Sequence, residues 1–142
     1  MSCAAIIVAA GRSQRMGFDK MLSMLNGQPV LQWSLDAFLE AEEIDTIVVV
    51  TSAERFAKLA PGTGKPVLRT EGDEERYLSV IRGMEALPSK PEYVTVHDGA
   101  RPLVLPGQID AVVRTARDEG ASALARRMTE TLKRSDSQCL TS

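Results

Sequence analysis

The sequence predicts an α/β domain of three layers, in which a mostly parallel, Rossmann-like sheet lies between two layers of helices. Short apolar runs rich in Ile and Val alternate along the chain with segments whose apolar residues recur at helical spacing. Strands that alternate with helices over short connections form parallel sheets with helices on their faces. The chain has 142 residues, of which 44% are hydrophobic and 25% charged. This size and composition suit one globular domain, so we expect residues 1–142 to form a single domain.

The strands are predicted from short apolar runs. The run Ala4–Ala9 is apolar at every position and is followed by Gly11, which is typical of a strand buried on both faces. Thr46–Thr51 has the same character. In chain order, we expect strands at residues 4–9, 46–51, 66–69, 93–97 and 121–125.

Helices are predicted between these strands, over residues 29–42, 52–59, 74–87 and 105–119. The long helices each have one apolar face, formed by Leu31, Leu35, Phe38 and Leu39, by Tyr77, Val80, Ile81 and Met84, and by Ile109, Val112, Val113 and Ala116. Pro29 suits a first helical turn, Ser52 a helix N-cap, and Gly120 the position after a helix. We expect Met21, Met24 and Met84 to fill the core.

The composition excludes several classes of protein. There are 17 basic and 19 acidic residues, a net charge of −2 and 4% aromatic residues, so we expect no nucleic-acid partner. Two cysteines near opposite ends and a single histidine leave no zinc-site spacing. No apolar run reaches the roughly 18–20 residues of a membrane span, and the N-terminus lacks the basic region of a secretory signal. We therefore expect a cytoplasmic protein with no membrane partner.

The first segment with evident chemistry follows the first predicted strand. Small residues at 9–11 let a ligand approach the backbone, whose N–H groups can hold phosphate oxygens. Arg12, Arg15 and Lys20 then place three cations close together in an acidic protein. The spacing matches neither a Walker A loop nor the dinucleotide glycine fingerprint. Because ligands of open α/β sheets bind beyond the carboxyl ends of the strands, we predict anion binding here; the alternative is a glycine turn with a solvated basic surface.

The second segment follows the strand predicted at 93–97. Asp98 suits a magnesium ligand beside substrate phosphates, and Arg101 can hold a phosphate through two hydrogen bonds. The alternative for Asp98 is an Asx turn before Gly99, and His97 is predicted to be a packed strand residue rather than a base. The acidic segment Glu71–Ser79 indicates by itself only a helix N-terminus. Together the segments indicate an enzyme that binds a nucleotide or sugar phosphate, with no residues arranged for covalent catalysis.

Four motifs resemble those of a known family. The stretch AAIIVAAGRSQRMGFDKMLSMLNGQPVLQWSL resembles the signature of nucleotidyltransferases with the glycosyltransferase-A-like fold. VHDGARP at 96–102 resembles the strand-end motif of the 2-C-methyl-D-erythritol 4-phosphate cytidylyltransferases. GDEERYLSV at 72–80 and TLKR at 131–134 resemble further motifs of that family. The resemblance covers nearly the whole chain in family order and implies a fold of the nucleotide-diphospho-sugar transferase type.

The resemblance also implies a reaction. CTP and a sugar-alcohol phosphate, 2-C-methyl-D-erythritol 4-phosphate, would give a CDP-alcohol and pyrophosphate in non-mevalonate isoprenoid biosynthesis. A phosphate monoester is already nucleophilic at neutral pH, so no strong base is needed. Catalysis would rest on positioning and charge neutralisation by Arg, Lys and Mg²⁺ or another divalent cation. A homodimer is implied as well.

The resemblance assigns roles residue by residue. It implies catalytic cations at Arg15 and Lys20, nucleotide binding by Ala9, Ala10, Gly11, Gly72, Asp73 and Ser79, and binding of the second substrate by Asp98, Arg101 and Thr131, with Asp98 also close to the metal. Arg15 would neutralise the triphosphate, Lys20 the α-phosphate, and Arg101 would hold the phosphate of the alcohol. Thr131 lies in a segment, about residues 127–142, that begins a dimerisation arm reaching a neighbouring subunit's site in the family.

The sequence departs from the family pattern in four ways. GDEER carries one more residue than the family form, which leaves two registers, one position apart, for the assignment of Gly72 and Asp73. Asp19 precedes Lys20 where Pro is usual, and Gly99 stands where Ala is commoner. The family also continues beyond TLKR to a second lysine that serves the triphosphate, so we expect this chain to lack the C-terminal part of such an enzyme. Two alternatives stay open: another nucleotidyltransferase, such as a molybdopterin cytidylyl- or guanylyltransferase, and a nucleotide-binding fragment without turnover. A Rossmann dehydrogenase is disfavoured because the glycine fingerprint is absent.

Overall fold

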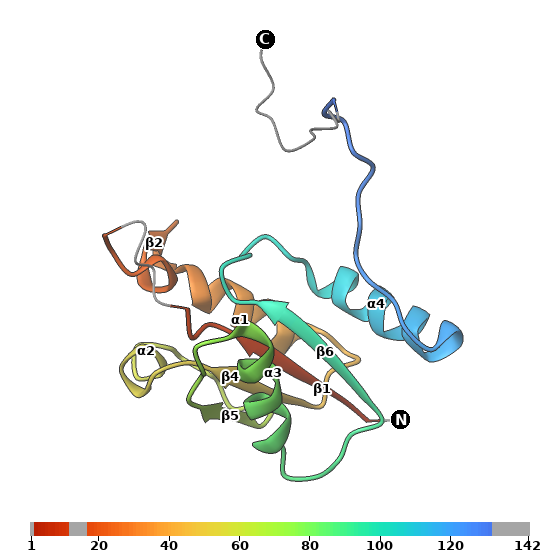
Figure 1. The fold of residues 1–142 in the computed structure, drawn as a ribbon, viewed down its shortest axis with the longest axis horizontal. Helices are drawn as coiled ribbons and strands as arrows, with labels where there is room; N and C mark the ends of the chain where they lie inside the picture. The colour runs from red at the N-terminus through yellow and green to blue at the C-terminus, as the bar shows by residue number, and fades with distance from the viewer. Residues whose placement is uncertain (1, 12–16, 132–142) are drawn as a thin grey trace, which may run out of the picture.

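The computed structural model describes residues 2–11 and 17–131 of the chain and has a parallel sheet at its centre (Figure 1). The strands are β1 (Cys3–Val8), β4 (Thr46–Val50), β5 (Val67–Thr70) and β6 (Tyr93–Asp98). They lie in the order β5-β4-β1-β6, and every neighbouring pair is parallel. The two central strands are the ones predicted from continuous apolar runs.

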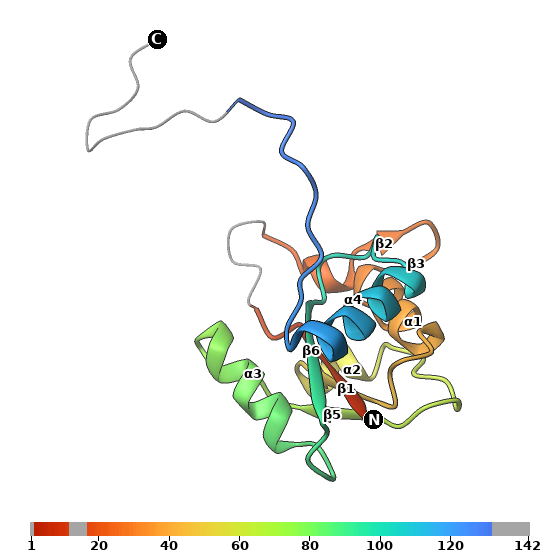
Figure 2. The ribbon, with the colours of Figure 1, turned by 90° about the vertical axis from the view of Figure 1, so that its right-hand side faces the viewer.

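Helices cover both faces of this sheet, as the continuous apolar strands require. In Figure 2, α3 (Arg76–Glu85) lies on one side of the sheet, while α1 (Val30–Glu40) and α4 (Pro106–Glu119) lie together on the other. Alternate residues of the strands pack against the helices of the two layers. Ile7 belongs to the core beneath α1 and α4, and Ile6 belongs to the core on the opposite face. The predicted three-layer α/β/α fold is confirmed.

The connection between β1 and α1 contains structure that the sequence analysis missed. It holds a short 3₁₀ helix, η1 (Lys20–Leu22), and a hairpin of β2 (Met24–Leu25) and β3 (Gln28–Pro29). Asn26 and Gly27 turn the hairpin with positive φ angles of 46° and 92°. The Asn-Gly pair is a strong hairpin signal and could have predicted it. A short helix, α2 (Ala53–Phe56), follows β4, with Ser52 as the predicted N-cap.

The strand predicted at 121–125 is not formed. Residues 121–131 have no regular structure and lead away from the sheet and helices (Figures 1 and 2). Within residues 2–11 and 17–131, no strand pairs with the outer edge of β6. The segment is rich in Ala, which has a low preference for strands, and it gains no ladder partner that could offset this.

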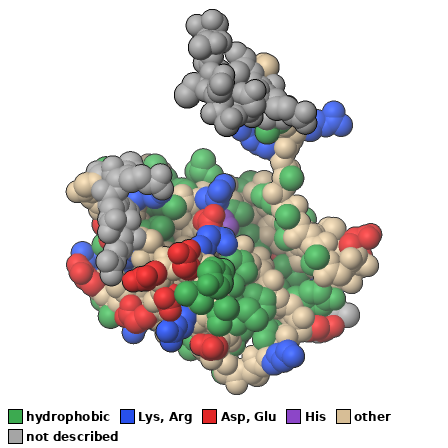
Figure 3. All heavy atoms as spheres, in the orientation of Figure 1, with side chains coloured by type: hydrophobic (Ala, Val, Ile, Leu, Met, Phe, Trp, Pro, Cys, Tyr) green, Lys and Arg blue, Asp and Glu red, His purple; other side chains and the backbone are tan. Residues whose placement is uncertain are grey.

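The apolar face predicted for the third helix is also wrong. Tyr77, Ile81 and Met84 are 63%, 45% and 51% exposed, and Figure 3 shows hydrophobic side chains gathered over this part of the molecule. Ser79 and Gly83 face the sheet instead. A Cβ on Gly83 would lie 2.6 Å from Cγ2 of Ile6, so the helix lies too close to β1 for a larger side chain.

The methionines divide in the same way. Met21 is buried as predicted, but Met24 in the hairpin and Met84 on α3 are exposed, so neither fills the core. By contrast, Leu31, Leu35 and Phe38 of the predicted α1 face are buried and Leu39 is half-buried. Ile109 and Val113 of α4 are buried as well. The helical spacing therefore identified the helices correctly, but identified the buried face only where large side chains meet the sheet.

Candidate functional site

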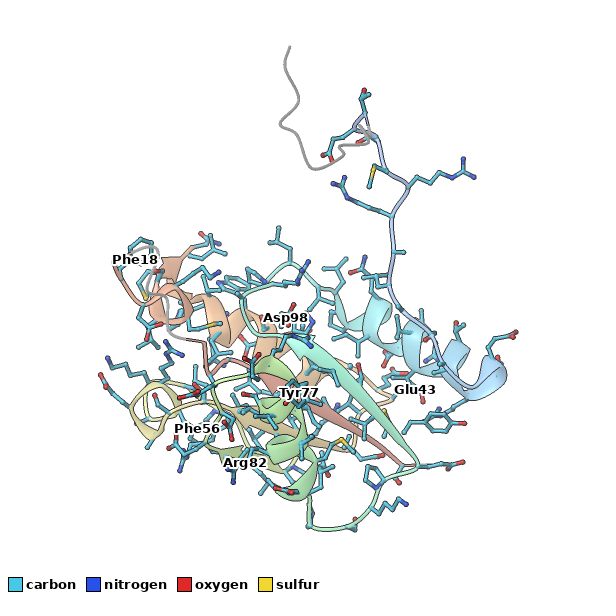
Figure 4. The ribbon with its side chains drawn as sticks, in the orientation of Figure 1. Phe18, Glu43, Phe56, Tyr77, Arg82 and Asp98 are labelled. Carbon is cyan, nitrogen blue, oxygen red and sulfur yellow. The ribbon has the colours of Figure 1, made fainter. Side chains whose placement is uncertain are left out.

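Most of the candidate residues that the structure describes lie in or beside loops at the carboxyl edge of the sheet. Because β1, β4, β5 and β6 run in the same direction, the loops that follow them all begin at this edge, where α/β enzymes bind their ligands. Figure 4 shows Asp98 at the arrowhead end of β6. In the same view Glu43 lies apart from it, near α4. The sheet therefore brings together segments that are far apart in the sequence.

The loop after β1 is anchored where it leaves the strand. The Ala9 N–H donates to the carbonyl oxygen of Val50 over 2.9 Å, and the Thr51 hydroxyl donates to the Ala9 carbonyl over 3.1 Å. Ala9 is buried, Ala10 half-buried and Gly11 exposed. The small side chains thus form a wall at the strand end, which a flat ligand can approach closely.

The same loop ends at Lys20, the first residue of η1. Lys20 is exposed, and Asp19 caps η1 by accepting a hydrogen bond from the Met21 N–H at 3.0 Å. Arg15, the other predicted catalytic cation, lies outside the described residues. The described part of the loop thus presents one of the two cations at the carboxyl edge of the sheet.

Gly72, Asp73 and Ser79 come together beside the wall formed by Ala10. The Asp73 N–H donates to the Ser79 hydroxyl oxygen over 2.9 Å, and that hydroxyl lies 3.3 Å from the Asp73 carbonyl oxygen. A Cβ on Gly72 would lie 2.0 Å from Cβ of Ala10 and 3.1 Å from Oγ of Ser79. Only glycine fits there, so the loop after β5 lies directly against the loop after β1.

The Asp73 carboxylate is held as an anion. The Glu74 N–H donates to it over 2.9 Å, and the Arg82 guanidinium lies 3.2 Å away. These hydrogen bonds, the one from Glu74 first, lower the pKa of Asp73 below its ordinary value. The acidic helix start that the sequence indicated is therefore a hydrogen-bonded loop with Ser79 buried at its centre.

Asp98 is paired with two arginines. Nε and Nη2 of Arg76 lie 3.0 and 2.7 Å from Oδ1, and Nε of Arg101 lies 3.1 Å from Oδ2. Burial disfavours the charged carboxylate, but the hydrogen bonds from the two arginines outweigh it and lower the pKa of Asp98. The sequence motif contained Arg76, but no role was predicted for it; its contact with Asp98 is formed only in the fold.

His97 is a packed strand residue, as predicted. Its ring centroid lies 5.1 Å from that of Phe38, and Nε2 lies 3.0 Å from the Arg101 carbonyl oxygen. Because a carbonyl oxygen only accepts, Nε2 carries the proton in this contact. Burial lowers the pKa of His97, which favours the neutral ring. The histidine therefore supports the turn that carries Asp98 and Arg101.

A groove of about 1180 Å³ runs beside β6 and α4. Arg76, Asp98 and Arg101 line it together with apolar residues of α4 and with residues 120–124. Neither the described residues of the loop after β1 (9–11 and 17–20) nor Gly72, Asp73 and Ser79 line this groove. Asp98 and Arg101, predicted for the second substrate, therefore lie apart from the described residues predicted for the nucleotide.

Few side chains in the described part of the chain are placed to bind a metal ion. There, no group of three or more His, Cys, Asp or Glu side chains is placed to hold an ion. Asp98 is a single carboxylate with both oxygens bound to arginines. Mg²⁺ is commonly held by one or two carboxylates together with substrate phosphates, so Asp98 fits a cation that arrives with phosphates and displaces an arginine.

The chain matches a family model over residues 3–142, and that model describes the 2-C-methyl-D-erythritol 4-phosphate cytidylyltransferases. The chain belongs to this family. A cytidylyltransferase of that name from Synechococcus sp. (strain WH7803) is 39% identical over 94% of this chain, and the match covers 62% of the relative. The chain therefore spans about three fifths of the length of the curated relatives it matches.

Solved structures confirm the nucleotidyltransferase fold. The 4-diphosphocytidyl-2C-methyl-D-erythritol synthase from Anaerococcus prevotii superposes with a TM-score of 0.70 and 26% identity, covering 82% of this chain and 51% of that one. A manganese complex of Rv0371C from Mycobacterium tuberculosis, 19% identical, shares the fold with a TM-score of 0.65, over 83% of this chain and 61% of that one. Membership of the cytidylyltransferase family decides against the molybdopterin and dehydrogenase alternatives.

The arm predicted at about 127–142 lies only partly within the described residues. Thr131 is exposed at the end of the extended segment, and residues 132–142, with the rest of the TLKR motif, lie outside them. Among the described helices, none is long and apolar enough to cross a membrane.

Proposed function

We propose that this chain carries the CTP site of a cytidylyltransferase that joins CTP to 2-C-methyl-D-erythritol 4-phosphate, a step of isoprenoid biosynthesis. One observation carries the proposal: Gly72, Asp73 and Ser79 lie against Ala10, at the same sheet edge as Asp98. Backbone groups at this junction are placed to read a base edge. The small residues leave room for the flat face of the base.

The chemistry follows from charge. An oxygen of the alcohol phosphate attacks the α-phosphorus of CTP, a P–O bond to it forms, and the bond to pyrophosphate breaks. Lys20 and Arg15 neutralise the negative charge that concentrates on the triphosphate during this step. Before substrate binds, Nε of Arg101 donates to Oδ2 of Asp98 over 3.1 Å, and on binding Arg101 exchanges this carboxylate for the phosphate of the alcohol. No residue needs to remove a proton, which agrees with a neutral, packed His97.

We also propose that a divalent cation, Mg²⁺ in the cell, enters with CTP and is approached by Asp98. Such a cation would offset phosphate charge and hold the triphosphate in one conformation. The manganese complex of the fold relative Rv0371C supports a divalent cation in this fold.

The assembly we propose is a homodimer in the cytoplasm. Residues 121–131 form no helix or strand, and near their start Ser122 donates to the Val112 carbonyl of α4 over 2.6 Å. The exposed residues 123–131 beyond it support an arm that binds a second subunit. Cys3 is a free, buried thiol, as expected in a reducing compartment.

Nucleotide choice gives the first test. CTP should raise the melting temperature of the chain more than ATP, GTP or UTP, because only cytosine suits the junction of Gly72 and Ser79. At about 100 times its Kd, a ligand adds roughly 2.7 kcal/mol to the free energy of unfolding. Equal shifts with all four nucleotides would rule out cytidine selectivity.

Turnover gives the second test. Pyrophosphate release from CTP, Mg²⁺ and the alcohol phosphate should fall about 10²–10³-fold in kcat when Lys20→Ala removes a cation from the reacting phosphates. Lys58→Ala is the matched control, because Lys58 is an exposed lysine on the neighbouring loop that pairs with Glu54. CTP binding without turnover by the unmodified chain would favour the nucleotide-binding fragment over the enzyme.

A further inference from the structure

We infer that Arg55 is a positioning residue of the nucleotide site: it holds the two described ends of the loop between β1 and η1 at a fixed separation. The inference rests on the proposed CTP site. Arg55 lies in α2, after β4, and belongs to no motif of the sequence analysis. Its side chain is only 12% exposed. An arginine so well covered needs partners for its charge and its five N–H groups.

All three nitrogens of the Arg55 guanidinium donate to described residues of the loop. Nη1 donates to the Ala9 carbonyl over 2.6 Å and Nη2 to the Gly11 carbonyl over 3.0 Å. Nε donates to Oδ2 of Asp19 over 2.6 Å. The first two partners lie where the loop begins, and the third lies where it ends. One planar group therefore fixes the separation and orientation of both ends.

Each end is in turn fixed to a residue or element of the site. The Ala9 carbonyl also accepts from Thr51, which follows β4. Asp19 caps η1 through Met21, and its carbonyl accepts from the Ser23 hydroxyl over 3.2 Å. Lys20 directly follows Asp19. The position of the Lys20 backbone relative to the wall at Ala9 thus depends on Arg55.

Asp19 explains why this chain relies on an ion pair. The family pattern has Pro before the lysine, whereas Asp19 stands there in this chain. Its φ of −78° is close to the angle that a proline ring imposes. Arg55 and the cap to Met21 hold by hydrogen bonds a backbone conformation that a proline would hold covalently.

The competing view is that Arg55 only stabilises the fold. Both views predict a lower melting temperature for Arg55→Gln, so stability alone does not separate them. Arg117→Gln is the matched control: Arg117 is 20% exposed and pairs with Glu43, at the amino end of β4, away from the site. Asp19→Asn tests the ion pair with the least change of shape and serves if Arg55→Gln fails to fold.

Two measurements test the inference. The first is the Kd for CTP by calorimetry, which should rise about 10- to 100-fold in Arg55→Gln and in Asp19→Asn, because small misplacements of binding groups are costly, but should stay unchanged in Arg117→Gln. The second, made without nucleotide, is amide hydrogen exchange of residues 17–23, which should quicken in the first two variants only. The double variant should bind CTP no more weakly than Arg55→Gln.

The outcomes separate the inference from the proposed function. Failure of the unmodified chain to bind CTP refutes the proposed site, and exchange at 17–23 still decides whether Arg55 holds the loop. Binding of CTP with the same Kd by the unmodified chain, Arg55→Gln and Asp19→Asn overturns the inference. Unchanged exchange at 17–23 in folded Arg55→Gln or Asp19→Asn overturns it as well.

Discussion

Replacing Gly83 by Ala should destabilise this protein, although Ala is the better helix former. Gly83 lies within α3 and faces the sheet. On helix preference alone, the substitution would stabilise the helix by about 1 kcal/mol. The added Cβ, however, would lie 2.6 Å from Cγ2 of Ile6 and 3.0 Å from Cγ2 of Val50.

The magnitude follows from how little these neighbours can move. Ordinary contact begins at 3.4 Å, so the Cβ is 0.8 Å too close to Ile6. Ile6 is fully buried in β1, which is paired on both edges, so α3 must shift outward. Overpacking of this kind costs about 1–3 kcal/mol. Set against the helix preference, this leaves a net loss of up to about 2 kcal/mol in the free energy of unfolding.

Urea denaturation followed by circular dichroism would measure this loss. Gly107→Ala is the control, because Gly107 lies in the first turn of α4 and a Cβ there meets nothing within 4 Å. It should stabilise by about 0.4–1 kcal/mol. If Gly83→Ala unfolds at the same or a higher urea concentration than the unmodified chain, α3 does not lie as close to β1 as described, and the account of its exposed apolar face is wrong.

Three further predictions concern titration and capping. Because burial lowers the pKa of His97, the folded protein binds fewer protons there than the unfolded chain. The stability that His97 contributes above about pH 6.5 should therefore be lost as the pH falls through the folded pKa. Since the chain has 1 histidine, a proton NMR titration of its ring reports the midpoint directly, and a midpoint at or above 6.5 contradicts burial as the cause. Hydrogen bonds from Arg114 and Arg117 lower the pKa of Glu43, so stability present above about pH 4.5 should be lost on further acidification, and Glu43→Gln should flatten that part of the urea-midpoint profile. Ser52→Ala should cost about 1 kcal/mol, because its hydroxyl accepts the Arg55 N–H at the start of α2; an unchanged urea midpoint would show that this cap is dispensable.

The fold was predictable where local pattern and tertiary environment agree. Runs such as Thr46–Thr51 can be buried only when both faces are covered, which is why they predicted the layers. The strand at 121–125 failed because pairing is a non-local property, and Ala-rich segments do not form strands without a partner. The face of α3 failed because close approach of a helix selects Gly83 and Ser79, which contribute little to an apolar pattern.

The site, like the fold, was predictable where a local motif was enough to identify a residue. Strand-end geometry and motif resemblance identified Asp98 and Gly72, and the structure brings their loops to one edge. Arg76 and Arg55 were missed because their roles depend on partners that only the fold supplies: Arg76 bonds Asp98, 22 positions away, and Arg55 bonds residues 36–46 positions away. No spacing rule connects such residues, and an arginine on a short helix resembles any solvated cation.

If Arg101 binds the phosphate of the alcohol as proposed, the pairing of Asp98 with two arginines makes that binding an exchange of partners. A phosphate that reaches Arg101 replaces the carboxylate at 3.1 Å, so its affinity reflects the difference between two ion pairs and not the full attraction of a bare cation. Dissolved salt weakens both pairs, which makes this contact less sensitive to ionic strength than an unpaired arginine would be. Because Arg76 bonds the other oxygen, Oδ1, Asp98 keeps a counter-charge when Arg101 exchanges its carboxylate for the phosphate.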